Sequence, residues 1–236
     1  MDRYRLSGIL LFFILLFGTL GFSREKFQAS VDFSLGFPWG GFNENIDGSG
    51  AGGSGYFAYK FKNSPFSAGV SFSVLVLGSQ TRTESFSTEI PEVEVDVTTR
   101  NYLLAGHLVL RIQPQDGSLR PYAEGLLGFN YLWTQTGVYG QGWGDRAIVS
   151  SVNQSDFAWS AGAGGGLMIR IYEKKGKRER DSFGIYVDAG TRYLFGGKAE
   201  YLSEGGIMVD DGGPVYDTRL SRTDLLATKI GLSFVF

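Results

Sequence analysis

The 236-residue sequence predicts an all-β fold, a transmembrane antiparallel up-and-down β-barrel of eight strands behind a cleaved N-terminal signal peptide. Three observations carry this prediction. Apolar side chains alternate with polar or small ones along eight segments, the connections between segments alternate between short and long, and an apolar stretch preceded by arginines opens the chain. The chain has 35 glycines, one histidine and no cysteine, which excludes disulfide frameworks and cysteine- or histidine-rich metal centres.

The first 23 residues have the order of a secretory signal peptide. Arg3 and Arg5 precede an apolar run over 9–20, and Gly21 and Ser23 place small residues at the −3 and −1 positions of a cleavage site. The run is shorter than the ~20 residues of a membrane-spanning helix, which disfavours an uncleaved anchor. We therefore expect residues 1–23 to be a Sec-type signal peptide and residues 24–236 to form one exported domain.

Each of the eight segments gathers its apolar side chains on one face, as a β-strand does when only one face is covered. In the first segment, for example, Phe27, Val31 and Phe33 alternate with polar residues. The predicted strands are residues 26–37, 55–61, 66–76, 101–111, 121–133, 157–171, 183–195 and 226–236. The second and fourth alternate least regularly, and no segment gives a convincing amphipathic helix.

The connections differ in length in a regular way. The short ones are 62–65, 112–119 and 173–182, and the long polar ones are 38–54, 78–99, 137–155 and 196–223. Short turns at one end and long loops at the other are typical of transmembrane barrels, and an even strand number puts both termini on one side. A ten-strand arrangement stays open, because residues 94–98 and 207–216 could form extensions or an extra hairpin.

The same alternation would also fit a soluble barrel with its apolar face inside. Three features favour apolar side chains outside. The polar face is rich in glycine, which suits the narrow interior of an eight-stranded barrel. Aromatic residues gather near strand ends, as in the girdles at membrane interfaces, and the chain ends on Phe236 within an alternating strand. We expect a monomeric barrel inserted in a membrane.

Two stretches carry a family resemblance: residues 120–130, which begin Arg120-Pro121-Tyr122 and contain spaced glycines, and the C-terminal Leu232-Ser233-Phe234-Val235-Phe236. With the signal peptide and the eight strands, they resemble the small outer-membrane β-barrels of Gram-negative-type bacteria, the outer-membrane protein A-like and porin-family barrels. The resemblance implies an integral protein of the bacterial outer membrane in contact with outer-membrane lipids and lipopolysaccharide. It also implies that the outer-membrane assembly machinery reads Leu232, Phe234 and Phe236.

Eight side chains on the predicted inner face form a candidate charge network, mostly in its periplasmic half. They are Asp32, His107, Arg111, Glu124, Arg170, Asp188, Arg192 and Lys229. Three acids face four permanent bases, so near-neutral pairing is expected, because an unpaired buried charge is expensive. Asp188 and Arg192 lie ~13 Å apart along one strand and cannot pair directly. Ring closure brings the last strand beside the first, which favours a Lys229–Asp32 pair. We expect a structural plug, with a narrow solute path as the alternative.

The remaining candidate sites have plainer explanations. His107 falls toward the periplasm, whereas lipid A occupies the outer leaflet, so we expect a hydrogen-bonding lumen residue rather than a catalytic base. Residues 48–53 match a dinucleotide-binding glycine pattern but precede no helix, so we expect a flexible loop tip. Acidic residues within 84–96 and 200–217 could bind cations that bridge lipopolysaccharide phosphates, and the basic turn over 174–180 could touch phosphate groups; solvated loops are simpler for both.

Composition narrows the functional classes. A net charge of −2 gives no basic footprint for nucleic acid, and the sequence points to no cofactor, no metal and no catalytic set. We therefore expect a non-enzymatic integral envelope protein with a structural or adhesion-like role through its long outer loops. A narrow channel for small solutes and a lipid-modifying enzyme are the alternatives.

Overall fold

The computed structural model describes residues 26–44, 46, 48–85, 94–140, 149–174, 183–210 and 213–236. The predicted signal peptide lies outside the described residues, as do 86–93 of the acidic loop and 175–180 of the basic turn. Across the described residues, no helix combines the length and the hydropathy needed to cross a membrane.

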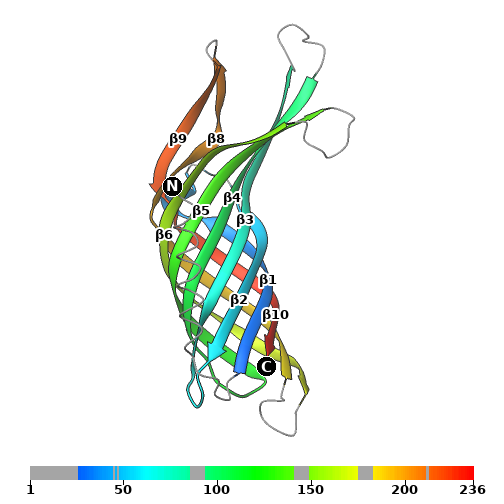
Figure 1. Ribbon diagram of the computed structural model, residues 1–236, viewed down its shortest axis with the longest axis vertical. Coiled ribbons are helices and arrows are strands. Elements are labelled where there is room, and N and C mark those ends of the chain that lie inside the picture. Colours follow the sequence, from blue (N-terminus) through cyan, green and yellow to red (C-terminus); the bar gives the residue numbers. More distant parts are fainter. Residues whose placement is uncertain are drawn as a thin grey trace, which may run out of the picture.

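Eight strands pair into one closed antiparallel barrel, which confirms the predicted fold (Figure 1). They are β1 (Lys26–Pro38), β2 (Gly50–Lys60), β3 (Phe66–Ser85), β4 (Glu94–Ile112), β5 (Leu119–Gly140), β6 (Val149–Lys174), β7 (Phe183–Gly196) and β10 (Leu225–Val235). The order around the ring is β1-β10-β7-β6-β5-β4-β3-β2, and β2 returns to β1. Closure lets the backbone satisfy its own hydrogen bonds where lipid offers none.

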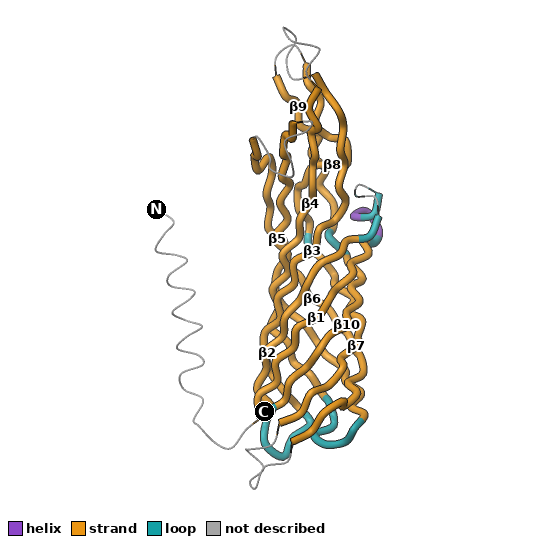
Figure 2. The backbone as a smooth tube through the Cα atoms, turned by 90° about the vertical axis from the view of Figure 1, so that its right-hand side faces the viewer, coloured by secondary structure: helices purple, strands orange, loops and turns teal. Residues whose placement is uncertain are grey.

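Two further strands form a separate hairpin between β7 and β10. β8 (Lys198–Asp210) pairs only with β9 (Gly213–Arg222), outside the ring. Within the described residues, the ring therefore has eight strands and the hairpin adds two outside it. Residues 94–98 extend β4, and residues 207–210 and 213–216 lie in the hairpin. Figure 2 shows the hairpin rising beyond the barrel, at the end opposite the C-terminus.

Half of the barrel wall is much taller than the other half. β3, β4, β5 and β6 have 20, 19, 22 and 26 residues, whereas β1, β2, β7 and β10 have 13, 11, 14 and 11. Much of the long loops expected over 78–99 and 137–155 is therefore strand. Most side chains in these stretches are polar, and short apolar alternations such as Val95 and Val97 are too brief to identify a half-covered strand.

Residues 50–53 correct another expectation, because they begin β2 instead of forming a loop tip. Gly52 pairs with Ser34 of β1 and with Leu75 of β3. A Cβ at Gly52 would collide with the Val74 carbonyl, so the glycines serve close strand contact at this point. Among the glycines of the 48–53 stretch, only Gly48, at a φ of 95°, has the backbone of a turn.

The barrel has apolar side chains on its outer face, as predicted, and its interior holds both polar and apolar side chains. Large outward-facing side chains remain exposed: Val31, Phe33, Phe57, Phe72, Leu108, Leu110, Leu127, Trp159, Ile169, Ile230 and Leu232. An apolar belt of this extent is far larger than a soluble protein leaves uncovered, and it rules out the soluble barrel. Closure and the apolar exterior together give the architecture of a transmembrane barrel of the outer-membrane type.

Candidate functional site

The barrel interior is filled by two layers of side chains. The charged layer, in the half nearer the termini, consists of Asp32, Arg111, Glu124, Asp188, Arg192 and Lys229. The apolar layer, nearer the outer end, is built around Phe42, Ile46, Leu75, Leu77, Leu103, Leu126, Leu132, Leu194 and Leu225. Together they are the candidate functional site, because a solute would have to pass both.

Glu124 lies at the centre of the charged layer and bridges two guanidinium groups. Arg111, its cross-strand neighbour on β4, donates from Nε and Nη2 to Glu124 Oε2 over 3.0 and 2.7 Å. Arg192, from β7 across the lumen, donates from Nε to Glu124 Oε1 over 2.6 Å. Each carboxylate oxygen therefore has an ionised partner, which is the condition for a stable buried charge.

Lys229 joins the first strand to the last. Its Nζ donates to Asp32 Oδ2 over 3.1 Å and to Asp188 Oδ2 over 3.0 Å. The pair favoured from the sequence is thus present, and Asp188 adds a second carboxylate from β7, the other neighbour of β10. Asp188 Oδ1 also accepts a hydrogen bond from the Tyr122 hydroxyl over 2.8 Å. Asp188 and Arg192, which strand geometry keeps apart, each have cross-strand partners instead.

Two tyrosine rings enclose the Arg111 guanidinium. Its Cζ lies 4.2 Å from the ring centroid of Tyr56 and 3.9 Å from that of Tyr122. Such cation–π contacts replace part of the hydration that a buried guanidinium loses. Sequence reasoning missed both tyrosines. The available signal was glycine, because a Cβ at Gly166 or Gly190 would collide with the Tyr122 hydroxyl.

Arg170 does not belong to this layer. Its guanidinium reaches Glu173 Oε1 over 2.9 Å and Ser118 Oγ over 3.0 Å at the inner rim, with 24% of the side chain exposed. A register shift between Arg170 and Tyr172 marks the point where β6 leaves regular pairing, and the alternation could not reveal it. The charged layer consequently holds three acids and three bases, and its formal charge is zero.

His107 belongs to β4 and lies outside the charged layer, with its side chain reaching toward Ser160 of β6. Its Nε2 is 3.0 Å from Ser160 Oγ, and both side chains are buried. The contact spans β5 at Gly128, where a Cβ would collide with the Gly106 carbonyl. A histidine beside a serine also occurs in nucleophilic catalysis, but this pair is enclosed by filled layers and fits a hydrogen bond across the lumen.

Below the charged layer, amide and hydroxyl groups and the buried guanidinium of Arg120 close the inner end. Gln113 Nε2 donates to Gln28 Oε1 over 2.9 Å, and Gln28 Nε2 donates to Ser233 Oγ over 2.9 Å. Arg120 lies against the Tyr186 ring, with 4.6 Å between its Cζ and the ring centroid. The sequence analysis included none of these residues in its candidate charge network.

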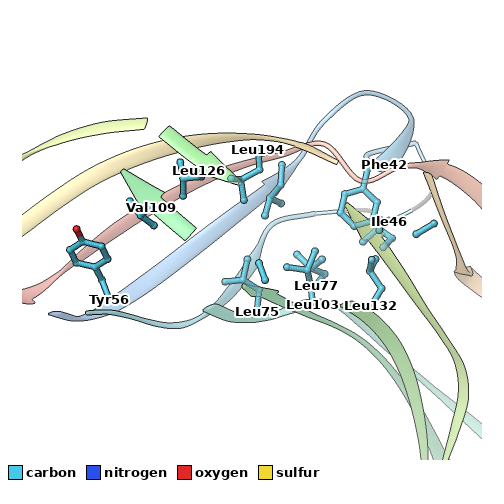
Figure 3. Close-up of a cluster of buried hydrophobic side chains, with 14 of the residues drawn as sticks. Phe42, Ile46, Tyr56, Leu75, Leu77, Leu103, Val109, Leu126, Leu132 and Leu194 are labelled. Carbon is cyan, nitrogen blue, oxygen red and sulfur yellow. The ribbon is translucent and has the colours of Figure 1, made fainter. Parts of the chain in front are cut away.

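The apolar layer was also not foreseen, because the inner face was expected to be polar throughout. Figure 3 shows Phe42 and Ile46 beside Leu132 at one end of the cluster, with Leu77 and Leu103 next to them. Phe42 and Ile46 are 0% and 1% exposed, and both come from the connection between β1 and β2. The outer end of the lumen is thus closed by hydrophobic packing, which excludes water.

Comparisons with known proteins find similar folds but no sequence family. No family model and no curated protein match the sequence. Among solved structures, OprG of Pseudomonas aeruginosa is 14% identical with a TM-score of 0.45 over 92% of this chain and 98% of that one. Ail of Yersinia pestis is 14% identical with a TM-score of 0.41 over 90% and 99%. A major outer-membrane protein of Thermus thermophilus is 14% identical with a TM-score of 0.36 over 89% and 99%. Identities this low transfer no activity.

The described residues contain no group of three or more histidine, aspartate or glutamate side chains arranged to hold a metal ion. In the described lumen, opposite charges pair and apolar side chains pack together.

Proposed function

We propose that the protein is a non-enzymatic outer-membrane scaffold that displays a rigid polar sheet at the cell surface for contact with other molecules. One observation carries the proposal: β3–β6 continue as paired strands beyond a barrel whose lumen is filled. The lower part anchors and the upper part is presented, within the same four strands (Figure 1).

The strand extensions are held together by hydroxyl contacts in place of apolar packing. Thr81 and Thr98 Oγ1 lie 3.0 Å apart, and Thr99 and Thr136 Oγ1 lie 3.1 Å apart. Thr134 donates to Asn101 Oδ1 over 2.6 Å. Cross-strand threonine pairs stabilise a sheet of largely polar side chains. Val95 and Thr98, at 5% and 8% exposure, show that one face of this sheet is partly covered.

The hairpin of β8 and β9 is fixed beside this sheet. Glu200 N donates to Asp156 Oδ2 over 2.7 Å, and Gly197 N donates to the Trp159 carbonyl over 2.6 Å. At its base, Gly196 N donates to Asp224 Oδ1 over 2.9 Å. These contacts join the hairpin to β6, so both can act as one contact surface.

The partners we propose follow from position. Outer-membrane lipids and lipopolysaccharide would cover the apolar belt, and the assembly machinery would read Leu232, Phe234 and Phe236 on the last strand. Phe236 exchanges two backbone hydrogen bonds with Phe27, which seals the strand seam at the inner rim. No partner of the extended sheet follows from its chemistry alone.

Adherence of bacterial cells tests the display role. Residues 81–98 would be replaced by a two-residue turn, which leaves the barrel wall intact, and cells carrying either form at equal surface level would be applied to an epithelial monolayer. We expect adherence to fall to that of cells lacking the protein. A Glu124→Gln variant alters the lumen and leaves the sheet in place, so it should adhere like the parent once inserted. Equal adherence of the shortened and full-length forms would refute the proposal.

The two alternatives have their own readouts. The filled layers weigh against a channel, so planar bilayers should show no discrete openings; openings that change on replacing Arg192 or Lys229 would favour a solute path instead. A lipid-modifying enzyme would alter the mass profile of lipid A between cells with and without the protein, and we expect no such change.

A further inference from the structure

The connection between β1 and β2 faces two different environments within four residues. Trp39 takes the next outward position after Phe33 and Phe37 on β1, and its side chain is 58% exposed. Phe42 points the opposite way into the apolar layer and is fully buried, as is Ile46. The segment that closes the lumen therefore also carries a large aromatic side chain on the lipid-facing side.

A short, well-defined turn couples these side chains. The 3-10 helix η1 (Gly40–Phe42) follows Trp39 directly, and Gly40 has a φ of 60°, which favours glycine. Trp39 N donates to the Asp224 carbonyl over 2.9 Å, and Ile46 N donates to the Phe42 carbonyl over 3.1 Å. With so few residues between them, Trp39 and Phe42 cannot move independently over any large distance.

The surroundings of Trp39 identify what covers it. The outward aromatics at this end of the wall include the Tyr102–Trp133 pair, with ring centroids 5.0 Å apart, and the Tyr193–Phe195 pair, at 4.8 Å. Such girdles lie at the boundary between hydrocarbon and head groups, where tryptophan is most favourable. Trp39 continues the lipid-facing side of β1, and Figure 2 places η1 at the outer end of the barrel. The chemistry that fits Trp39 is a lipid head-group interface.

We propose that this connection is a membrane-anchored lid. Trp39 inserts into the outer lipid interface, and that contact holds Phe42 and Ile46 seated in the mouth of the barrel. The membrane thus takes part in closing the lumen from the outside. This role is separate from the surface display proposed above and does not depend on any partner of the extended sheet.

The absence of cysteine makes thiol labelling a direct test. Ser34 is buried just inside the apolar layer, because the next inward residue, Gly36, would meet Leu75 and Leu225 with a Cβ. In the Ser34→Cys protein, reconstituted in phospholipid vesicles, a charged thiol reagent added to the bulk should react slowly. Adding Phe42→Ala with Ile46→Ala should make the reaction fast. Adding Trp39→Ala should accelerate it by about tenfold, which equals about 1.4 kcal/mol in the opening equilibrium.

Trp159→Ala is the matched control. Trp159 is 71% exposed on the lipid face of β6, a strand of the wall. Unlike Trp39, it does not lie in a connection that folds into the mouth of the barrel. Its loss should leave the labelling rate of the Ser34→Cys thiol within about twofold of the parent, and Trp39→Phe should retain most of the protection. Heat-modifiable gel mobility verifies that each variant is folded.

Three results would overturn the lid. The first is equal labelling of the Trp39→Ala protein and its parent. The second is equal acceleration by Trp159→Ala, which would indicate a general loss of anchoring. The third is fast labelling of the parent, or slow labelling of the Phe42→Ala, Ile46→Ala protein, since either would mean that these side chains do not seal the mouth.

Discussion

The membrane-embedded part of β3–β6 and the part that extends above the barrel share one hydrogen-bonded backbone but differ in what holds neighbouring side chains together. In the membrane, Phe72, Leu108 and Leu127 face lipid, and the opposite face is buried against charges and leucines. Above it, hydroxyls such as those of Thr99 and Thr136 pair across the strands. Strand pairing is therefore independent of the surrounding solvent, whereas side-chain chemistry changes where the strand leaves the lipid.

The largest difference in loss of stability between the two regions should come from removing a carboxylate from the charged layer or from the extended sheet. Glu124→Gln removes the carboxylate that accepts from both Arg111 and Arg192 in a buried site and leaves Arg111 only its 4.0 Å contact with Asp188. Removing one partner of a buried ion pair costs about 3–5 kcal/mol. Asp96→Asn removes a carboxylate from the extended sheet, where Asp96 accepts a hydrogen bond from Thr83, and should cost under about 1 kcal/mol. Denaturant unfolding of the lipid-inserted protein measures both. Similar losses would mean that the lumen is far wetter than its burial indicates.

The second largest difference in stability should come from placing a charge on the lipid face. Leu108→Arg places a cation on the outward face of β4 inside the membrane, at a cost of about 2–4 kcal/mol near the bilayer midplane. Ser79→Arg puts the same side chain on an exposed position of the β3 extension and should change stability by about 0.5 kcal/mol or less. Heat-modifiable mobility and vesicle insertion report the difference. Equal insertion of both variants would contradict the membrane boundary drawn between these positions.

The smallest effect should come from the hydroxyl contacts. Thr99→Val removes one hydrogen bond to Thr136 in a wet sheet and should cost about 0.5–1 kcal/mol. Because the loss is local, hydrogen exchange of amides in the β4 and β5 extensions should rise while that of the barrel amides stays constant. A uniform rise along β4 would show that extension and barrel open together as one cooperative unit.

The parts of the fold that could be predicted from the sequence are those with one face in lipid. β1, β7 and β10 were placed to within a residue or so at each end, because lipid on one face enforces period two. The extensions of β3–β6 were not predicted, because polar residues occupy most positions of both faces and the alternation fades. The start of β2 was not predicted, because glycine has no side chain to alternate.

For the site, strand alternation and ring closure were enough to nominate all six residues of the charged layer and the Lys229–Asp32 pair, although they also placed Arg170 in it. They could not show that Tyr56 and Tyr122 enclose Arg111, because the register between distant strands sets that contact. Nor could they reveal the apolar layer. Leucines such as Leu103 resemble any other apolar residue until the strand is long enough to show which face they occupy.

Lys229 and its two carboxylates also have a meaning for the assembly of the barrel. Asp32 comes from the first strand, Asp188 from the seventh and Lys229 from the last, so the three meet only at the seam where the ring closes. Before β10 docks, the nascent sheet holds two acids with no ammonium group between them. Lys229 can meet Asp188 once β10 pairs with β7, but it meets Asp32 only when β1 and β10 close the ring, so an unfinished barrel is electrostatically distinct from a finished one.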